Sequence, residues 1–416
     1  MEENNRMTLR EDADYIVKEA IRRVLPDEAV AAALKGKSFG SGSLYLVAAG
    51  KAAWQMAKTA VELLEDQLER GIVITKYDHV KGALPRISCY EAGHPVPDKN
   101  SFLATQAALD MVADLQEGDT VLFLLSGGGS ALFEKPLISG EELADITKQL
   151  LACGADIVEM NTIRKRFSAV KGGRFAKLCE PAKVYSIVLS DILGDPLDMI
   201  ASGPAYPDSS TCEQALAIAD KYQLQLSEQA MELLHQETPK KLHNVTTEIT
   251  GSVRNLCLAA KEACEALGYE AFILTDQLEC VAREAGIFLG DIAKSHQGTE
   301  KSLAFIAGGE TVVHLTGHGK GGRNQELALA AATVIDGLKD TAVFSVGSDG
   351  TDGPTDAAGG YSDHDTARLL SEKKINIFQV LQENDAYHAL KETGGLLMTG
   401  ATGTNVNDVA VVLVKR

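Results

Sequence analysis

A glycine-rich turn carries the groups from which an anion site can be built. An apolar run ends in Ser126, Gly127, Gly128, Gly129 and Ser130. Glycines leave backbone N–H groups uncovered, and such donors near the start of a helix attract a phosphate or a carboxylate. The alternative is an ordinary strand-to-helix turn with glycine-only backbone angles. We predict that residues 126–130 form a loop that binds phosphate or substrate.

Two basic residues lie at similar turns. Lys51 follows an apolar run, and Arg323 follows a glycine-rich segment at the predicted start of a helix. Lysine supplies a mobile point charge, whereas arginine offers a planar fork that fits carboxylate or phosphate. The turn at Lys51 is not a Walker A loop, because Tyr45 and Ala52 stand where that motif needs glycine and a hydroxyl. An arginine at a helix N-terminus needs an acid or an anion opposite it, so Arg323, with Asn324 beside it, is a candidate to contact substrate.

Acidic residues follow two further predicted strands. Asp191 and Asp195 come after the first, and Asp349 and Asp352 come after the second. Carboxylates at the ends of strands suit Mg²⁺ or a base that receives a hydroxyl proton. We predict a catalytic role for Asp191, a substrate contact for Asp195, and a metal site at Asp349 and Asp352. The alternative for each aspartate is a turn or a helix cap.

The second half of the chain also contains loops with hydroxyl, amide and backbone donors. The spacing of acids between 349 and 356 excludes the calcium-loop pattern and favours a loop for Mg²⁺ and nucleotide. The nucleotide-binding candidates are Gly350, Thr351, Asp352, Thr402, Gly403 and Asn405.

Two other features remain open between chemistry and structure. His94 lies in a proline-rich loop, where it could act as a general base or bond the backbone. The segment 161–174 is the most basic part of the chain. It is either a solvated helix face or a local positive patch that draws a small anion into a cleft.

The composition limits the classes of partner. A net charge of −18 argues against nucleic acid or an anionic membrane as the main partner. Seven cysteines without a Cys-x-x-Cys pair fit reduced thiols better than disulfides or a zinc site. The N-terminus has no apolar signal segment and no apolar run is long enough to span a membrane, so we expect a cytoplasmic protein.

These turns need strands and helices that hold them, and the chain alternates between both. Helical spacing begins near Glu11, and Pro26 is expected to end that helix. We place a domain boundary in the polar segment around 238–243, giving domains 1–240 and 241–416. Repeated strand and helix predict an α/β fold in which both domains have three α/β/α layers and mainly parallel sheets, the second parallel or mixed.

Taken together and in order, these loops resemble the class II glycerate 2-kinases. The resemblance covers nearly the whole chain and rests on the segments 125–131, 189–195, 202–204, 308–311, 321–326, 350–353 and 402–405. It implies a Rossmann-like, larger N-terminal domain and a C-terminal domain of the type called MOFRL. It also implies transfer of the γ-phosphoryl group of ATP, with Mg²⁺, to the 2-hydroxyl of D-glycerate. Residues proposed at the family's active site fall on Lys51 and Arg323, and we expect that site in the interdomain cleft.

Two other functions compete with the kinase, and a homodimer remains open. Members of this family have been labelled hydroxypyruvate reductases. Against that activity, no predicted strand runs directly into Gly-x-Gly-x-x-Gly with an acid about 20 residues later, as dinucleotide binding would require. The third hypothesis is a non-catalytic sensor that binds a small phosphorylated acid. This hypothesis gives no role to the clustered aspartates.

Overall fold

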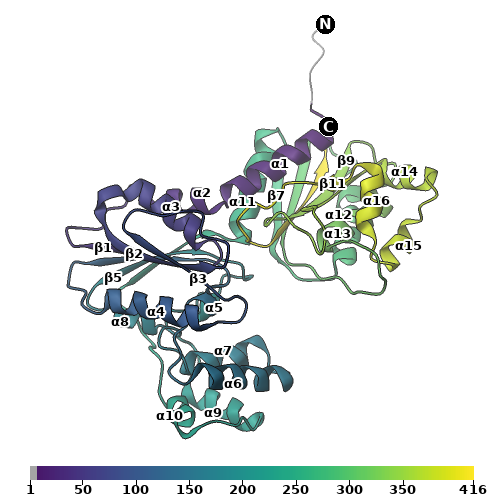
Figure 1. Cartoon of the computed structure of the whole chain (residues 1–416). Coiled ribbons are helices and arrows are strands. Elements are labelled where there is room, and N and C mark those ends of the chain that lie inside the picture. The colour runs from purple at the N-terminus through teal and green to yellow at the C-terminus, as the bar shows by residue number, and fades with distance from the viewer. Residues whose placement is uncertain (1–6) are drawn as a thin grey trace. The chain divides into compact units, whose positions relative to one another are not determined.

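Short apolar runs form the strands of two separate six-stranded sheets (Figure 1). The computed structural model describes residues 7–416. It divides into two compact units. One comprises Ala29–Thr250, and the other comprises Gly251–Arg416 together with the described N-terminal residues as far as Glu28.

The sheet of the Ala29–Thr250 unit has the order β3-β2-β1-β4-β5-β6. The pairs β1–β2, β2–β3, β1–β4 and β4–β5 are parallel. Apolar clusters cover both faces, which explains why β1 and β4 are almost continuously apolar. The strands are β1 (Leu44–Ala49), β2 (Leu68–Lys76), β3 (Ile87–Ala92), β4 (Thr120–Leu125), β5 (Lys183–Leu189) and β6 (Val245–Gly251). This is the Rossmann-like strand order, and it reverses between β1 and β4.

Helices lie against this sheet, and four others, α6, α7, α9 and α10, form a separate group beside it (Figure 1). These four share an apolar cluster of their own. The helices are α2 (Pro26–Leu34), α3 (Ala53–Leu64), α4 (Lys99–Val112), α5 (Gly129–Leu132), α6 (Gly140–Ala152), α7 (Ile157–Arg166), α8 (Arg174–Leu178), α9 (Cys212–Lys221) and α10 (Glu228–Leu234). Short 3₁₀ turns are η1 (Glu65–Gln67) and η2 (Ile200–Ser202).

The second sheet has the order β11-β10-β9-β12-β8-β7. Its strands are β7 (Glu270–Leu278), β8 (Leu303–Gly309), β9 (Thr341–Gly347), β10 (Gly359–Asp363), β11 (Leu396–Leu397) and β12 (Asp408–Val414). The strands β7, β8, β9 and β11 point one way, and β10 and β12 point the other way. The second sheet is therefore mixed rather than mainly parallel in its pairing, because the last strand, β12, inserts between β8 and β9 and pairs antiparallel with both.

Helices of the second unit cover its sheet in the same three-layer manner. They are α1 (Leu9–Arg23), α11 (Val253–Ala266), α12 (Ala282–Ser295), α13 (Arg323–Ile335), α14 (Thr366–Glu372), α15 (Ile377–Gln382) and α16 (Ala386–Thr393). Figure 1 shows α1 lying beside α11. None of the helices in the described part of the chain is long and apolar enough to cross a membrane.

The domain limits predicted from sequence differ from the two units in two respects, and one predicted helix end also differs. The predicted boundary near residue 240 lies too early, because β6 completes the first sheet. The N-terminal helix belongs with the C-terminal residues, since Asp12 accepts a hydrogen bond from Tyr269 and pairs with Lys415 at 2.7 Å. Pro26 does not only end a helix but begins α2, where proline at the first position loses no intrahelical bond. The predicted site between the domains stays a prediction.

Candidate functional site

The turn after β1 and the turn after β4 interlock where the strand order reverses. The Lys51 N–H donates to the Gly127 carbonyl at 2.9 Å. The Ala52 N–H donates to Ser126 Oγ at 3.1 Å. Open α/β sheets bind ligands at this reversal, beyond the carboxyl ends of the strands. The structure thus brings together Lys51 and the 126–130 loop, which the sequence placed in separate turns.

Each of the three central glycines faces a side chain at close range. A methyl group on Gly127 would lie 2.3 Å from Oδ2 of Asp191. One on Gly128 would lie 3.0 Å from Cδ2 of His94 and 3.2 Å from Cγ of Lys51, and Gly128 has a φ of +85°. The turn is therefore a bare backbone platform with Asp191 on one side and His94 and Lys51 on the other.

The N–H groups of this platform are only partly used by the turn itself. The Gly129 N–H donates to the Ser126 carbonyl, and the bonds of α5 follow from there. Among the described residues, no backbone bond takes up the N–H of Gly127 or Gly128. Because α5 has only four residues, its dipole adds little to the attraction of an anion. An anion would be bound here mainly by the uncovered N–H groups.

The backbone of Lys51 is held by hydrogen bonds, whereas its ammonium has no partner among the described residues. Its carbonyl accepts from Thr75 Oγ1 at 3.3 Å, and its N–H is bonded as described above. The side chain is exposed, and its ammonium has no hydrogen-bond or ion-pair partner among the described residues. A charge held at the platform without a structural partner is available to a ligand.

His94 and Asp191 complete this group, and Asp195 lies in the loop that follows Asp191. Burial, helped by the charges of Lys51 and Lys76, lowers the pKa of His94, which favours the neutral imidazole that can accept a hydrogen bond. Oδ1 of Asp195 is buried without a hydrogen-bond partner in the described structure, and its φ is +51°. The sequence analysis predicted roles for both aspartates and left the role of His94 undecided between catalysis and structure. Only the fold shows that His94 lies against Gly128.

The second predicted centre, Arg323, is paired with acids. Its Nε lies 2.5 Å and its Nη2 3.1 Å from the carboxylate of Asp408, and its Nη1 donates to Glu310 Oε1 at 3.0 Å. Burial alone would lower the pKa of Arg323, but the adjacent Asp408 outweighs it and raises that pKa. Burial also holds the pKa of Asp408 above its usual value. The expected acid partner is thus present, although the sequence analysis did not single out Asp408 or Glu310.

Asp352 holds the first turn of α13. Its two carboxylate oxygens accept the N–H groups of Asn324 and Gln325 at 3.1 Å and 2.9 Å, and burial raises its pKa to about 6. The Asn324 side chain is buried as well and bonds Ser345 Oγ at 2.6 Å and Asp352 at 3.3 Å. Asp352 and Asn324 therefore shape the turn that presents Arg323, and their polar groups are engaged within the protein.

Asp349 remains the acid of this region with coordination capacity. One of its oxygens accepts the Thr351 N–H at 2.9 Å, and the other has no partner among the described residues. No group of three or more His, Cys, Asp or Glu side chains able to hold a metal occurs within residues 7–416. Mg²⁺ commonly uses one or two carboxylates and completes its shell with water and phosphate oxygens, so Asp349 fits such a site and Asp352 does not.

The two loops predicted to bind nucleotide lie against each other. The Thr402 N–H donates to the Asp349 carbonyl at 3.2 Å, and Thr402 Oγ1 donates to the Ser348 carbonyl at 2.6 Å. A methyl group on Gly350 would meet the Gly400 carbonyl oxygen at 1.9 Å. The neighbouring Gly403 has a φ of +82°, and Asn405 Oδ1 accepts from the Asn407 N–H at 3.3 Å.

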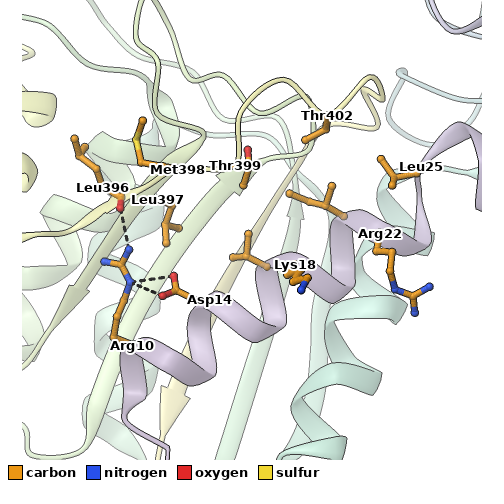
Figure 2. A pocket seen from close by; sticks show the side chains of 12 residues that line it. Arg10, Asp14, Lys18, Arg22, Leu25, Leu396, Leu397, Met398, Thr399 and Thr402 are labelled. Carbon is orange, nitrogen blue, oxygen red and sulfur yellow. Dashed lines mark hydrogen bonds and ion pairs between the residues drawn. The ribbon is translucent and has the colours of Figure 1, made fainter.

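Beside these loops lies a cavity of about 630 Å³. Figure 2 shows its two walls, with Arg10, Lys18 and Arg22 of α1 on one side and the segment from Leu396 to Thr402 on the other. Six apolar side chains, two threonines and the charged residues Arg10, Asp14, Lys18 and Arg22 line it, and its volume is in the range of small-molecule sites.

The basic segment 161–174 is neither a solvated face nor a free positive patch. Lys165 and Arg166 are buried and lie 3.0 Å and 3.7 Å from Asp208. Lys171 is also buried, and its Nζ lies 3.0 Å from Oε2 of Glu134. Since acids inside the fold neutralise these cations, both expectations for this segment are wrong at these three positions.

Known proteins are similar in sequence to almost the whole chain. One family model, described as a domain of unknown function (DUF4147), matches residues 12–235, and the MOFRL family model matches residues 303–408. The D-glycerate 2-kinase of Thermotoga maritima is 50% identical over 98% of this chain and 99% of its own length. The glycerate 2-kinase of Pyrococcus horikoshii is 41% identical over 98% of each chain. A protein of Agrobacterium vitis named putative hydroxypyruvate reductase is 37% identical over 90% of this chain and 100% of its own.

The fold is shared with a solved structure as well. A crystal structure of glycerate kinase from Thermotoga maritima has a TM-score of 0.94 to this chain, with coverage of 98% of this chain and 99% of that one.

Proposed function

This chain belongs to the glycerate kinase family in which a DUF4147 region precedes a MOFRL region, and we propose that it phosphorylates D-glycerate at the 2-hydroxyl with ATP. The products are 2-phospho-D-glycerate and ADP. The observation that best supports this chemistry is that Lys51 lies beside Gly127 and Gly128, and that among the described residues neither its ammonium nor their N–H groups have a partner. Phosphoryl transfer needs charge neutralisation and positioning, and both groups supply these.

In the proposed reaction, the 2-hydroxyl oxygen of glycerate forms a bond to the γ-phosphorus while the bond from that phosphorus to the bridging oxygen of ADP breaks. Asp191, held against Gly127, orients the hydroxyl and accepts its proton. Asp195 contributes its unpartnered oxygen to the glycerate hydroxyls. Lys51 and the platform N–H groups hold the phosphoryl oxygens as their charge redistributes.

Arg323 is the proposed substrate contact of the other unit. Three of its five N–H donors are used by Asp408 and Glu310, which leaves two for a carboxylate or phosphate oxygen. Asp349 would hold Mg²⁺, which when bound neutralises phosphate charge.

We assign the nucleotide to the adjoining loops Gly350–Thr351 and Thr402–Asn405, and its base to the cavity of Figure 2. The cavity wall includes Thr402, whose bonds to Ser348 and Asp349 join it to the acidic loop. This arrangement accounts for a cavity with apolar and charged lining beside groups suited to phosphate and Mg²⁺.

Replacing the exposed Thr399 on the cavity wall with tryptophan should raise KM for ATP by about tenfold, which corresponds to about 1.4 kcal/mol of binding. KM for glycerate should not change, because the indole fills only the cavity assigned to the base. Steady-state kinetics with each substrate varied measures both constants. Phe378→Trp, on a 72% exposed side chain of α15, is the matched control. An unchanged KM for ATP in T399W removes the base from this cavity.

The kinase assignment itself is tested by ADP release over a panel of small hydroxy acids. We expect ADP only when D-glycerate or a near relative is present, and phosphorus NMR of the product should show the ester at the 2-position. A 3-phosphate product would overturn the regiochemistry, and absence of ADP release would overturn the kinase. Binding of the acids without turnover would instead support the sensor hypothesis.

The reductase hypothesis meets a structural difficulty. Gly317, Gly319 and Gly322 do have the spacing of a dinucleotide-binding turn, and a helix follows them. However, β8 ends at Gly309, so these glycines do not directly follow a strand as a dinucleotide-binding turn does. Consumption of NADH or NADPH with hydroxypyruvate would reverse this assignment.

A further inference from the structure

Behind the glycine platform lies a fully buried ion pair that the proposed chemistry does not use directly. Lys171 and Glu134 have no exposed side-chain surface, and Nζ lies 3.0 Å from Oε2 of Glu134. The same Nζ donates to the carbonyls of Ser130 at 2.7 Å and Phe133 at 3.2 Å. The ammonium thus donates to the carbonyls of Ser130 and Phe133 and forms an ion pair with Glu134, whose carboxylate oxygens accept no hydrogen bond among the described residues.

The residues next to Lys171 hold a second loop. The N–H groups of Gly172 and Gly173 donate to the carbonyls of Ser202 at 3.0 Å and Gly203 at 2.7 Å. The backbone φ is positive at Ala201, Ser202 and Gly203, a conformation that surrounding contacts must maintain at the two residues that are not glycine. This loop begins with Asp191, so one short segment bonds both the platform and the loop that carries the proposed base.

A series of largely buried side-chain hydrogen bonds also joins the same two loops. Ser130 Oγ lies 2.9 Å from Ser202 Oγ, and Ser202 Oγ donates to Asn161 Oδ1 at 3.0 Å. The platform is therefore tied to the Asp191 loop both through Ser130 and through Lys171. A shift of Lys171 would change the separation of Gly127 and Asp191.

Stability alone is a weak reason for such a pair. A buried lysine and glutamate lose their hydration, and apolar residues of similar size often fill the same space at equal or lower cost. Burial accordingly lowers the pKa of Lys171 to about 8, although Glu134 opposes this effect. What apolar side chains cannot reproduce is the pair of bonds to the Ser130 and Phe133 carbonyls.

We propose that Lys171, paired with Glu134, is a positioning residue that sets the platform 127–130 against Asp191 for phosphoryl transfer. The inference rests on the proposed function. If it is correct, loss of the pair slows the phosphoryl-transfer step. Nucleotide binding should not change, because the proposed nucleotide loops belong to the other unit.

The double variant K171M/E134L removes both charges and keeps much of the buried volume. We expect kcat for glycerate to fall by about tenfold or more, since small misplacements of reacting groups reduce rates on this scale. KM for ATP should stay within twofold, and the melting temperature should remain near that of the wild type. The ion pair of buried Asp12 and partly buried Lys415, in the other unit, gives the control: D12N/K415M should lower the melting temperature without reducing kcat.

A folded K171M/E134L variant with kcat within twofold of the wild type overturns the positioning role. If the double variant does not fold, K171R tests the inference instead, because arginine keeps the charge but moves the N–H donors. A reduced kcat at a wild-type melting temperature supports the positioning role. An unchanged kcat overturns it. The wild type is measured in the same assay. If it shows no turnover of glycerate, the proposed function fails, and this outcome is distinct from a normal wild type with a normal variant.

Discussion

Arg323→Ala should reduce kcat/KM for glycerate by about a thousandfold, the effect of removing an arginine that stabilises a transferring phosphoryl group. The two N–H donors that Asp408 and Glu310 leave free are the ones lost to the substrate. The variant should also melt at a lower temperature, because Asp408 stays buried without its cation. Steady-state kinetics and thermal unfolding measure the two effects separately.

Two further variants separate catalysis from stability at this position. R323A/D408N leaves no unpaired buried carboxylate, so it should recover the melting temperature but not the activity. R323K keeps a charge beside Asp408 and loses the planar fork, so it should stay well below wild-type kcat/KM. Activity near that of the wild type in R323A would show that Arg323 only closes a buried ion pair with Asp408.

Lys51→Met should reduce kcat by about a hundredfold or more, the scale measured when one group that stabilises transition-state charge is removed. In contrast to Arg323, the melting temperature should not change, because the ammonium has no partner among the described residues and the side chain is exposed. The backbone bonds to Gly127 and Thr75 remain available to methionine, so the platform should keep its shape. Kinetics and thermal unfolding on the same preparation test both expectations.

The exposed Lys81 of the same unit provides the matched control, and K81M should retain full activity. K51R should restore part of the rate, since it returns a positive charge with a different reach. If K51M turns over glycerate at the wild-type rate, Lys51 is not part of the phosphoryl site, and the platform would have to act through its N–H groups alone.

The sequence alone was sufficient for the α/β class, for most strands and for the turns that carry the chemistry. Buried parallel strands such as β1 and β4 are continuously apolar, and glycine, lysine and aspartate at their ends are visible in the local pattern. The requirement for an acid opposite Arg323 also followed from local electrostatics, because a helix N-terminus repels a cation. Motif order along the chain identified the family, which the similarity to known glycerate kinases confirmed.

Only the tertiary structure decided which of these residues meet. Asp408 joins Arg323 because β12 inserts between β8 and β9, a long-range pairing that no local pattern encodes. The same limit explains why the N-terminal helix was assigned to the wrong unit, since its partners Tyr269 and Lys415 lie hundreds of residues away. Local composition showed that Lys171 is a cation and Asp352 an acid. Burial decided that the first supports the glycine platform and that the second holds the start of α13, because a charge without water must find its partners inside the fold.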